Sequence, residues 1–301
     1  MLHFLFIGGL KNLNNLESKK YWIWFSLIKN LGARKKMNLL NRYDSPEKIF
    51  RLGEEELFEQ KGIGRETVKN ILDKEVRDDI KKHMKYMEMH NITIVNIFDK
   101  EYPQILKKIY DPPISLYVKG DIKTLNNQCI SIIGCRNYSD YGKKAAKYFA
   151  FNLAKKDFTI VSGLAKGIDS FAHIASIVAK GRTIAVLGNG LDCIYPKENN
   201  WIADEILKNG GALISEYPLG TKPDKMNFPA RNRIVSGLSK AILVVEAKEK
   251  SGTLITVDFA LEQGREVFVV PGNINSINSV GTNELIKQGA RVICSVEDVD
   301  F

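Results

Sequence analysis

The stretch that decides the fold is KMNFPARNRIVSGLSKAILVVE, residues 225–246. Pro229 suits the first position of a helix. Backbone N–H groups at a helix start have no partner within the helix, and proline has no N–H group. We therefore predict a helix that begins at Pro229 and runs through Ile234 and Leu238. The apolar run from Ala241 to Glu246 predicts a buried strand after it. A helix that leads directly into a buried strand is typical of an α/β sheet.

The same alternation of apolar strands and helical segments continues on both sides of this stretch. Continuous apolar runs separated by helices indicate a parallel sheet covered on both faces, so we predict an α/β, extended Rossmann-like fold over residues 126–301. Almost every predicted strand ends in a loop with Gly or Ser, and these loops would lie along the carboxyl edge, where such sheets bind ligands. The predicted strands are residues 130–133, 159–161, 184–187, 213–214, 242–245, 267–270 and 292–293.

The first part of the chain has a different pattern. Residues 1–90 are predicted to form a small helical domain, because apolar residues recur at helical spacing there. Residues 91–125, with short strands near 92–95 and 116–118, are predicted to connect this domain to the sheet and to pack on it. Within the helical part, QKGIGRE resembles the turn of a helix-hairpin-helix motif, whose backbone N–H groups can hold a DNA phosphate. The residues that could contact duplex DNA there are Lys61, Gly62, Gly64 and Arg65, although such hairpins also serve as packing units.

Composition restricts the class of protein. The chain has 44 basic and 35 acidic residues, a net charge of +9, which favours a polyanionic partner. Its four cysteines are scattered without a CxxC pair, which predicts no metal site and a reducing, cytoplasmic location. The apolar start MLHFLFIGGL has no preceding basic residue and no cleavage pattern, so it is not interpreted as a signal peptide. We also expect no membrane span.

The strand-end loops are suited to phosphate, although they match no nucleotide fingerprint. GCRNYSDYG is not GxGxxG, and no GxxxxGK[ST] is present, so we predict no cofactor. Glycines let a ligand approach the backbone closely, hydroxyl groups can donate hydrogen bonds, and the following helix starts offer free N–H groups. The candidate residues in these loops are Gly134, Arg136, Ser162, Gly163, Lys166, Ser251 and Thr253.

Residues 225–233 combine one aromatic ring with several cationic and amide side chains. Phe228 can stack on a flat ring, and guanidinium groups can pair with phosphate oxygens. Single-stranded nucleic acid has both groups, so we predict a binding site for it here. The simpler interpretation is a solvated basic helix start with a half-buried phenylalanine. The candidate residues are Lys225, Phe228, Arg231, Asn232 and Arg233.

Several carboxylates raise the alternative that the protein is an enzyme. Carboxylates are predicted near the same edge of the sheet, at Asp169, Glu216, Glu246 and Glu262. A nucleotide hydrolase that uses Glu246 or Glu262 as its acid or base on a 5′-phosphate substrate is the alternative function. Asp169 falls where it can satisfy N–H groups at a helix start without any chemistry. No catalytic residue is assigned, and the favoured interpretation is a non-enzymatic protein. A third interpretation is an interaction scaffold whose basic surface is incidental.

With these residues assembled, the chain resembles the DNA-processing protein A (DprA/Smf) family. The resemblance runs in family order through about residues 130–294, and the connecting and helical regions resemble the family too. It rests on the segments IIGCRNYSDYG, VSGLAKGIDSFAH, VLGNGLDCIYP, ISEYPLG, NFPARNRIVSGLS, VVEAKEKSGTLITVDFALEQGREVFVVPG and GTNELIKQGA.

The resemblance implies a sterile-alpha-motif-like helical domain before the Rossmann-like sheet. It implies sequence-independent binding of single-stranded DNA, protection of incoming DNA and loading of the RecA recombinase during natural transformation. By position, Arg136, Lys225, Phe228 and the arginines of FPARNR would line the strand-binding pocket. The family usually has Ser or Thr where this chain has Cys135. A carboxyl-terminal winged-helix domain, which some members carry, is not expected here.

The resemblance also implies a homodimer. Our hypothesis for part of its surface is the helix GTNELIKQGA, with Leu285 and Ile286.

Overall fold

A computed structural model describes residues 16–60 and 62–300. The chain divides into two compact units, with the division between Glu88 and Met89. Two features of the sequence analysis lie outside the described residues: the segment MLHFLFIGGL, which was not interpreted as a signal peptide, and Lys61, a predicted DNA contact. Within those residues, no helix is both long enough and apolar enough to cross a membrane.

The first unit is helical. Ser45 caps its third helix by accepting a hydrogen bond from the backbone N–H of Lys48. Trp24 is fully buried, and its ring meets Phe50 edge-on with centroids 4.9 Å apart. The helices are α1 (Leu16–Leu27), α2 (Ala33–Tyr43), α3 (Pro46–Phe50), α4 (Glu54–Phe58), α5 (Arg65–Leu72) and α6 (Lys74–Met89).

The predicted hairpin turn lies between α4 and α5. Gly62 has φ +83°, a left-handed conformation that glycine adopts without strain. Ile63 is buried between the two helices, and Gly64 is the residue immediately before α5. The turn therefore has the glycine–apolar–glycine geometry that the sequence predicted.

The second unit contains a twisted sheet with, in the described residues, nine strands in the order β1-β2-β6-β5-β4-β3-β7-β8-β9. The pairs β1–β2 and β2–β6 are antiparallel, and the remaining neighbours are parallel. The strands are β1 (Ile92–Asn96), β2 (Ser115–Gly120), β3 (Cys129–Ile133), β4 (Thr159–Ser162), β5 (Thr183–Val186), β6 (Ala212–Ser215), β7 (Ala241–Val244), β8 (Glu266–Val269) and β9 (Arg291–Val292).

The segment predicted as a connector contributes two strands to this sheet. Strand β2 pairs with β6, and β1 pairs with β2 at one edge of the sheet. Tyr102, between these strands, is fully buried, and its hydroxyl donates a 2.7 Å hydrogen bond to the carbonyl of Pro113. The segment is therefore part of the sheet.

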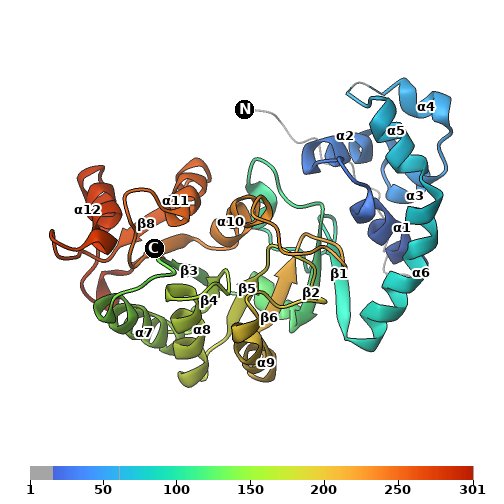
Figure 1. The fold of residues 1–301 in the computed structure, drawn as a ribbon. Helices are drawn as coiled ribbons and strands as arrows, with labels where there is room; N and C mark the ends of the chain where they lie inside the picture. Colours follow the sequence, from blue (N-terminus) through green and yellow to red (C-terminus); the bar gives the residue numbers. More distant parts are fainter. Residues whose placement is uncertain (1–15, 61, 301) are drawn as a thin grey trace. The chain divides into compact units, whose positions relative to one another are not determined.

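Helices cover both faces of the sheet. Figure 1 shows α7, α8 and α9 on one side and α10, α11 and α12 on the other. Ser131 in β3 confirms the second layer, because its hydroxyl donates a 2.7 Å hydrogen bond to the carbonyl of Val235 in α10. These helices are α7 (Asp140–Lys155), α8 (Ile168–Val178), α9 (Asn200–Lys208), α10 (Asn227–Gly237), α11 (Gly252–Glu262) and α12 (Val280–Lys287). Short 3₁₀ helices are η1 (Leu106–Lys108), η2 (Ile122–Asn126), η3 (Lys197–Asn199), η4 (Ile277–Ser279) and η5 (Val296–Asp298).

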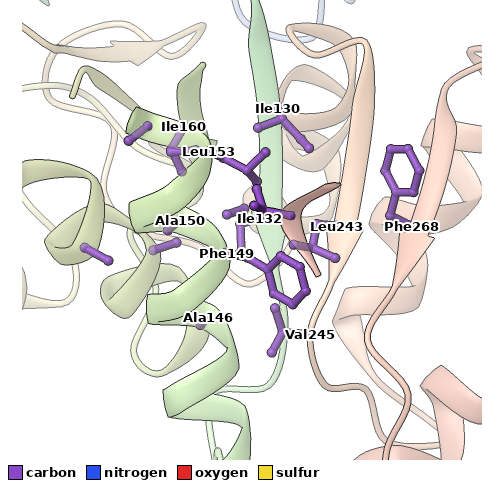
Figure 2. Packing of buried hydrophobic residues seen from close by; sticks show 14 of the residues in the cluster. Ile130, Ile132, Ala146, Phe149, Ala150, Leu153, Ile160, Leu243, Val245 and Phe268 are labelled. Carbon is purple, nitrogen blue, oxygen red and sulfur yellow. The ribbon is translucent and has the colours of Figure 1, made fainter. Parts of the chain in front are cut away.

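The core under α7 and α8 is apolar. Figure 2 shows Ile132, Phe149 and Leu243 packed between the central strands and α7, and Phe268 of the same cluster further along the sheet on β8. Each is at most 2% exposed. Burial of one such side chain contributes about 1.5–3 kcal/mol, so this layer holds the central strands firmly in register.

The order of the strands reverses at β3. Strands β4, β5 and β6 follow one another on one side of β3, and β7, β8 and β9 follow on the other side. At such a reversal the loops after the two neighbouring strands diverge to opposite faces and leave a crevice at the carboxyl edge. Here those loops follow β3, at Gly134 to Arg136, and β7, at Val245 to Ala247.

Candidate nucleic-acid interface

The first turn of α10 places Phe228 over the carboxyl ends of the strands. The helix begins at Asn227, two residues before Pro229, which was predicted to be its first residue. Pro229 therefore lies in the first turn. The half-buried ring of Phe228 lies against Gly188, in the loop after β5. A methyl group at Gly188 would come within 2.8 Å of the ring, so glycine is required for this close approach.

Phe228 forms a flat surface together with two side chains from other loops. Tyr195, after β5, stacks on it with ring centroids 5.5 Å apart and planes inclined by 28°. The guanidinium carbon of Arg136, after β3, lies 5.8 Å from the centroid of the Phe228 ring. Arg136 is exposed, and Tyr195 is 45% exposed. We call Arg136, Tyr195 and Phe228 the aromatic platform.

Arg231, by contrast, points its guanidinium into the protein. It is 5% exposed, and its Nη1 donates hydrogen bonds to the carbonyls of Gly163, at 2.9 Å, and Val186. Burial lowers the pKa of Arg231 to about 10, and the guanidinium therefore remains charged at neutral pH. A Cβ at Gly163 would meet this guanidinium at 2.7 Å. Arg231 and Gly163 were both predicted to contact the ligand. In the structure they contact each other beneath the loops that would meet it.

Arg233 is also buried, and it forms a bidentate ion pair. Its Nη1 and Nη2 each donate to a carboxylate oxygen of Glu216 at 2.6 Å, and its Nε donates to Asp111 at 2.9 Å. Burial by itself lowers the pKa of Arg233, but the two carboxylates raise it, and the net shift is upward. This arginine joins α10 to the end of β6 and to the segment between β1 and β2. It is not on the ligand surface that the sequence predicted.

Asp169 organises the loop after β4. Its carboxylate accepts hydrogen bonds from the backbone N–H groups of Gly163, at 3.1 Å, and Ala165, at 3.4 Å. Burial raises the pKa of Asp169, although the positive charge of Arg231 and these N–H groups act in the opposite direction. The carboxylate thus has a structural role, but the N–H groups that it binds belong to the loop before α8 and not to the helix start considered from the sequence.

The loop that carries Arg136 is clamped from two sides. Ser139 caps α7 by accepting from Gly142 N–H at 3.0 Å. Glu246, which is 1% exposed, accepts from both the backbone N–H of Ser139, at 3.1 Å, and its hydroxyl. Asn278, from η4, donates to the carbonyl of Asn137 at 3.0 Å. These bonds fix the Arg136 loop relative to β7 and to η4.

Several other predicted residues lie inside or serve as caps. Ser162 is fully buried, and its hydroxyl donates to the carbonyl of Ile132 at 2.7 Å, so the structure does not place it on the ligand surface. Thr253 is 8% exposed, and Ser251 caps α11 by accepting from its N–H. Both residues follow β7. This strand lies on one side of β3, whereas β5, whose loop carries Tyr195, lies on the other side. Gly134 packs against Ile168.

The remaining predicted cations are at the surface. Lys225 is exposed, three residues before Phe228. Lys166 is exposed too and forms a 2.6 Å ion pair with Glu198. Asn232 is half-buried, and its side-chain oxygen accepts from Arg231 Nε at 3.2 Å. Of the predicted cations, Arg136, Lys166 and Lys225 are thus exposed, and Arg136 is the one that the structure places against the Phe228 ring.

The carboxylates do not form an acid–base pair. Glu246 is used by the Ser139 clamp, and Glu216 by Arg233. Glu262 is the last residue of α11, and the helix begins at the carboxyl edge of the sheet. An eleven-residue helix is about 16 Å long, so Glu262 lies at the opposite edge from the one predicted. Burial raises the pKa of Cys135, which leaves it a thiol rather than a nucleophile.

In the helical unit, the structure gives Gly62, Gly64 and Arg65 the expected turn. Arg65 is exposed and lines an open groove with acidic and basic side chains, including Glu54, Asp73 and Lys69. This mixed charge does not single out a phosphate, so duplex contact by the hairpin stays a prediction. Lys61 lies outside the described residues.

One residue of the platform was missed. Tyr195 was not selected from the sequence, although it stands in the CIYP segment directly after the glycine-rich loop that follows β5. An aromatic residue next to proline in a strand-end loop is the signal that could have identified it. Its partner Phe228 is 33 residues later, so the pairing itself depends on the fold.

The arrangement can hold a flat ring next to an anion. Phe228 and Tyr195 offer π-faces, and base–aromatic stacking of this kind tolerates any base. Arg136 places positive charge beside the Phe228 ring, and the exposed Lys225 comes three residues before Phe228 in the sequence. A doubly wound α/β protein with such a surface at the carboxyl edge of its sheet belongs to the class of proteins that bind a stacked, anionic ligand.

The comparisons with known proteins identify the family. Residues 93–300 match the family model of DNA recombination-mediator protein A. The chain therefore belongs to that family, and the resemblance found in the sequence is confirmed, as is the α/β fold.

Relatives and solved structures agree with this assignment. The chain is 50% identical over 209 residues to the DNA processing protein DprA of Bacillus subtilis, which covers 69% of this chain and 70% of that protein. It is 44% identical to protein Smf of Escherichia coli, over 74% of this chain and 60% of that one. The crystal structure of DprA from Streptococcus pneumoniae superposes with a TM-score of 0.80 at 35% identity, covering 93% and 96% of the two chains.

A second solved structure is DNA processing protein A from Helicobacter pylori. It superposes with a TM-score of 0.63 at 34% identity, and the match covers 69% of this chain and 93% of the Helicobacter pylori chain. The work on that protein concerns its mode of binding single-stranded DNA.

Proposed function

We propose that this protein binds single-stranded DNA, with a base stacked on the aromatic platform. The observation that carries the proposal is the stack of Tyr195 and Phe228 beside the exposed Arg136. Rings that are already stacked and partly exposed present a face to a base without first having to assemble. The single-strand binding of the Helicobacter pylori relative supports the same ligand.

The basic residues around the platform hold the phosphate backbone. Each phosphate that a lysine or arginine neutralises releases counterions, so the affinity falls as the salt concentration rises. The DNA contacts that we propose are made by Arg136, Lys166, Lys225, Tyr195 and Phe228. Arg231, Arg233, Ser162, Gly163, Asp169 and Asn232 support this surface from below, and Gly134, Ser251 and Thr253 shape the adjoining loops.

The proposed role is DNA processing rather than catalysis. The carboxylates at the carboxyl edge already have partners: Asp169 binds backbone N–H groups, Glu246 binds Ser139 and Glu216 binds Arg233. These contacts hold the loops in place. As the family resemblance implies, the bound strand is protected and delivered to the RecA recombinase, in the cytoplasm. This activity would serve transformation or recombination.

The test is fluorescence anisotropy with a labelled oligo-dT strand and a matched duplex. Phe228→Ala removes the stacking face and is expected to weaken strand binding by about 1–3 kcal/mol, or about 5- to 150-fold in Kd. Arg136→Ala is expected to weaken binding in the same direction. The matched control is Leu261→Ala, which removes a 59% exposed side chain near the end of α11, away from the carboxyl edge. Wild-type affinity in both folded platform variants would reject the proposal.

The homodimer is proposed separately. Leu285 is only 8% exposed within one chain, so it belongs to the monomer core and cannot serve as a clean interface probe. Ile286, which is half-buried, is the better probe of the surface of α12. We expect Ile286→Glu to shift the mass in light scattering toward the monomer, and an unchanged mass would exclude this face.

A further inference from the structure

A second aromatic and basic cluster lies on the other side of the Arg136 loop. Tyr138 meets Phe171 of α8 edge-on, with ring centroids 4.6 Å apart and planes at 89°. Two lysines of α7 lie over the Phe171 ring, with the Nζ of Lys143 at 5.5 Å and that of Lys147 at 5.7 Å from its centroid. We call these four residues the α7–α8 cluster.

The cluster is open to solvent where a ligand could reach it. Tyr138 is 42% exposed, Lys147 is exposed, and Lys143 and Phe171 are half-buried. Lys143 and Lys147 are four residues apart, so they share one face of α7. Phe171 lies in the first turn of α8, which brings the rings to the carboxyl edge of the sheet.

A lysine over a phenylalanine is often only a local surface contact. The same helix contains such a contact, because Lys155 lies over the Phe151 ring at 5.7 Å. That pair has one cation and one ring, near the carboxyl-terminal end of α7. The α7–α8 cluster instead gathers two rings and two cations at the edge where the platform stands. The number and the place of its groups therefore set it apart from the local contact.

The loop between the two surfaces keeps them close. Arg136 of the platform and Tyr138 of the cluster are two residues apart, and an extended chain spans about 7 Å over that distance. Adjacent nucleotides of a strand are about 3.4 Å apart along a stacked helix, so a few nucleotides can reach from one surface to the other. The clamp by Glu246 and Asn278 fixes this spacing.

We propose that the α7–α8 cluster is a second subsite for the same single strand. The strand leaves the platform on the α10 side, crosses the sheet edge over the Arg136–Tyr138 loop and stacks a base on Tyr138. Lys143 and Lys147 then hold the phosphates that follow. This inference rests on the proposed single-strand binding and adds a direction to it, from the α10 layer to the α7 and α8 layer.

The test compares short and long oligo-dT strands, of about 4 and about 16 nucleotides, in anisotropy titrations over a salt series. Tyr138→Ala is expected to weaken binding of the long strand by about 5-fold or more and to leave the short strand unchanged. The double variant Lys143→Ala/Lys147→Ala is expected to lower the salt slope for the long strand by about 1.4, because each lost phosphate contact removes about 0.7. Lys155→Ala is the matched control, and it is expected to bind both strands like the wild type.

A photo-cross-link supplies an independent readout. A long dT strand that carries one 5-iododeoxyuridine is irradiated with the protein, and the linked peptide is identified by mass spectrometry. Cross-links to the peptide of Tyr138 from one strand position, and to that of Tyr195 or Phe228 from another, are expected. Circular dichroism of each variant confirms its fold, and Tyr138→Leu keeps an apolar contact with Phe171 if the alanine variant unfolds.

The outcomes separate the two proposals. If Phe228→Ala loses both strands while the cluster variants bind the long strand like the wild type, the second subsite is wrong and the platform stands. Equal losses for both strand lengths in Tyr138→Ala would also overturn it, because they would place Tyr138 in the platform itself. If Phe228→Ala binds both strands like the wild type, the proposed function is rejected, and the second subsite, which rests on it, is rejected with it.

Discussion

Phe228 and Arg231 lie three residues apart on α10, and the structure uses them in opposite ways. The ring of Phe228 rests on Gly188 and remains partly open to solvent, whereas the guanidinium of Arg231 extends below the loops to the carbonyls of Gly163 and Val186. One side chain meets the ligand, and the other holds the loops that support the first. A motif rich in arginine therefore does not by itself reveal which of its charges are free.

The same difference separates Arg233 from Arg136. Arg233 is enclosed by Glu216 and Asp111, and Arg136 projects from a loop whose backbone is clamped. The interior arginines should thus control folding, and the exposed residues should control binding. The following predictions test whether the two sets can be separated in this way.

The largest effect is expected for Arg233→Ala. Removal of the guanidinium leaves the half-buried carboxylate of Glu216 without its partner and empties a buried site, and breaking a buried pair costs about 3–5 kcal/mol, so we expect a loss of about 3 kcal/mol. Urea unfolding followed by circular dichroism measures this loss. Arg136→Ala is the control and should change the free energy of unfolding by no more than about 0.5 kcal/mol, because its side chain is at the surface. Equal stabilities for the two variants would break the comparison.

The next effect is a dependence of stability on pH, caused by His173. This residue is fully buried against Thr183, and burial lowers its pKa to about 3. Below about pH 6.5 the unfolded chain takes up a proton that the folded chain does not, so stability falls as the pH falls. One such histidine costs about 2 kcal/mol between pH 7 and pH 5. We expect His173→Gln to flatten the stability profile over this range, and an unchanged slope would contradict the assignment.

A smaller effect is expected when a methyl group is added below the platform. In Gly188→Ala the new Cβ would stand 2.8 Å from the Phe228 ring, so the ring must move. We expect strand affinity to fall about tenfold, equivalent to about 1.4 kcal/mol. Gly252→Ala is the matched control, because its Cβ would meet nothing within 4 Å. If Gly188→Ala binds like the wild type, the position of the ring does not matter to the ligand.

The smallest effect is expected for Lys225→Ala. This exposed lysine contributes a phosphate contact and no buried interaction, so the fold should be unaffected. The slope of log K against log salt should decrease by about 0.7 for a single strand. The titration is repeated with Lys180→Ala, an exposed lysine that follows α8, far from the strand-end loops. Identical slopes for Lys225→Ala and the wild type would remove Lys225 from the interface.

The fold was largely accessible from the sequence, because buried parallel strands have a simple signature. Each predicted run lies within a residue or two of a strand, and the central ones, such as residues 130–133 and 242–245, match strands that are buried throughout. The last predicted run, residues 292–293, corresponds to the short edge strand β9, which is exposed. Boundaries were less accurate, because the helix predicted to begin at Pro229 begins two residues earlier, at Asn227.

The candidate site was only partly accessible, because its selection depends on partners that are distant in the sequence. Phe228 and Arg136 were identified as a ring and a cation at the ends of predicted strands. Nothing local showed that Arg233 would pair with Asp111, 122 residues earlier, or that Ser162 would bond to the carbonyl of Ile132. Tyr195 and Tyr138 were missed for the same reason, since an exposed tyrosine becomes informative only when its neighbouring rings are known.

The clamp on the Arg136 loop has a consequence for the speed of binding. Because Glu246 and Asn278 hold the loop before any ligand arrives, association requires little ordering of the protein, and that cost of binding is reduced. The association rate is then governed by encounter, which positive charge accelerates and salt slows. A strand can thus be captured as soon as it meets the surface, and how long it stays depends on the rings.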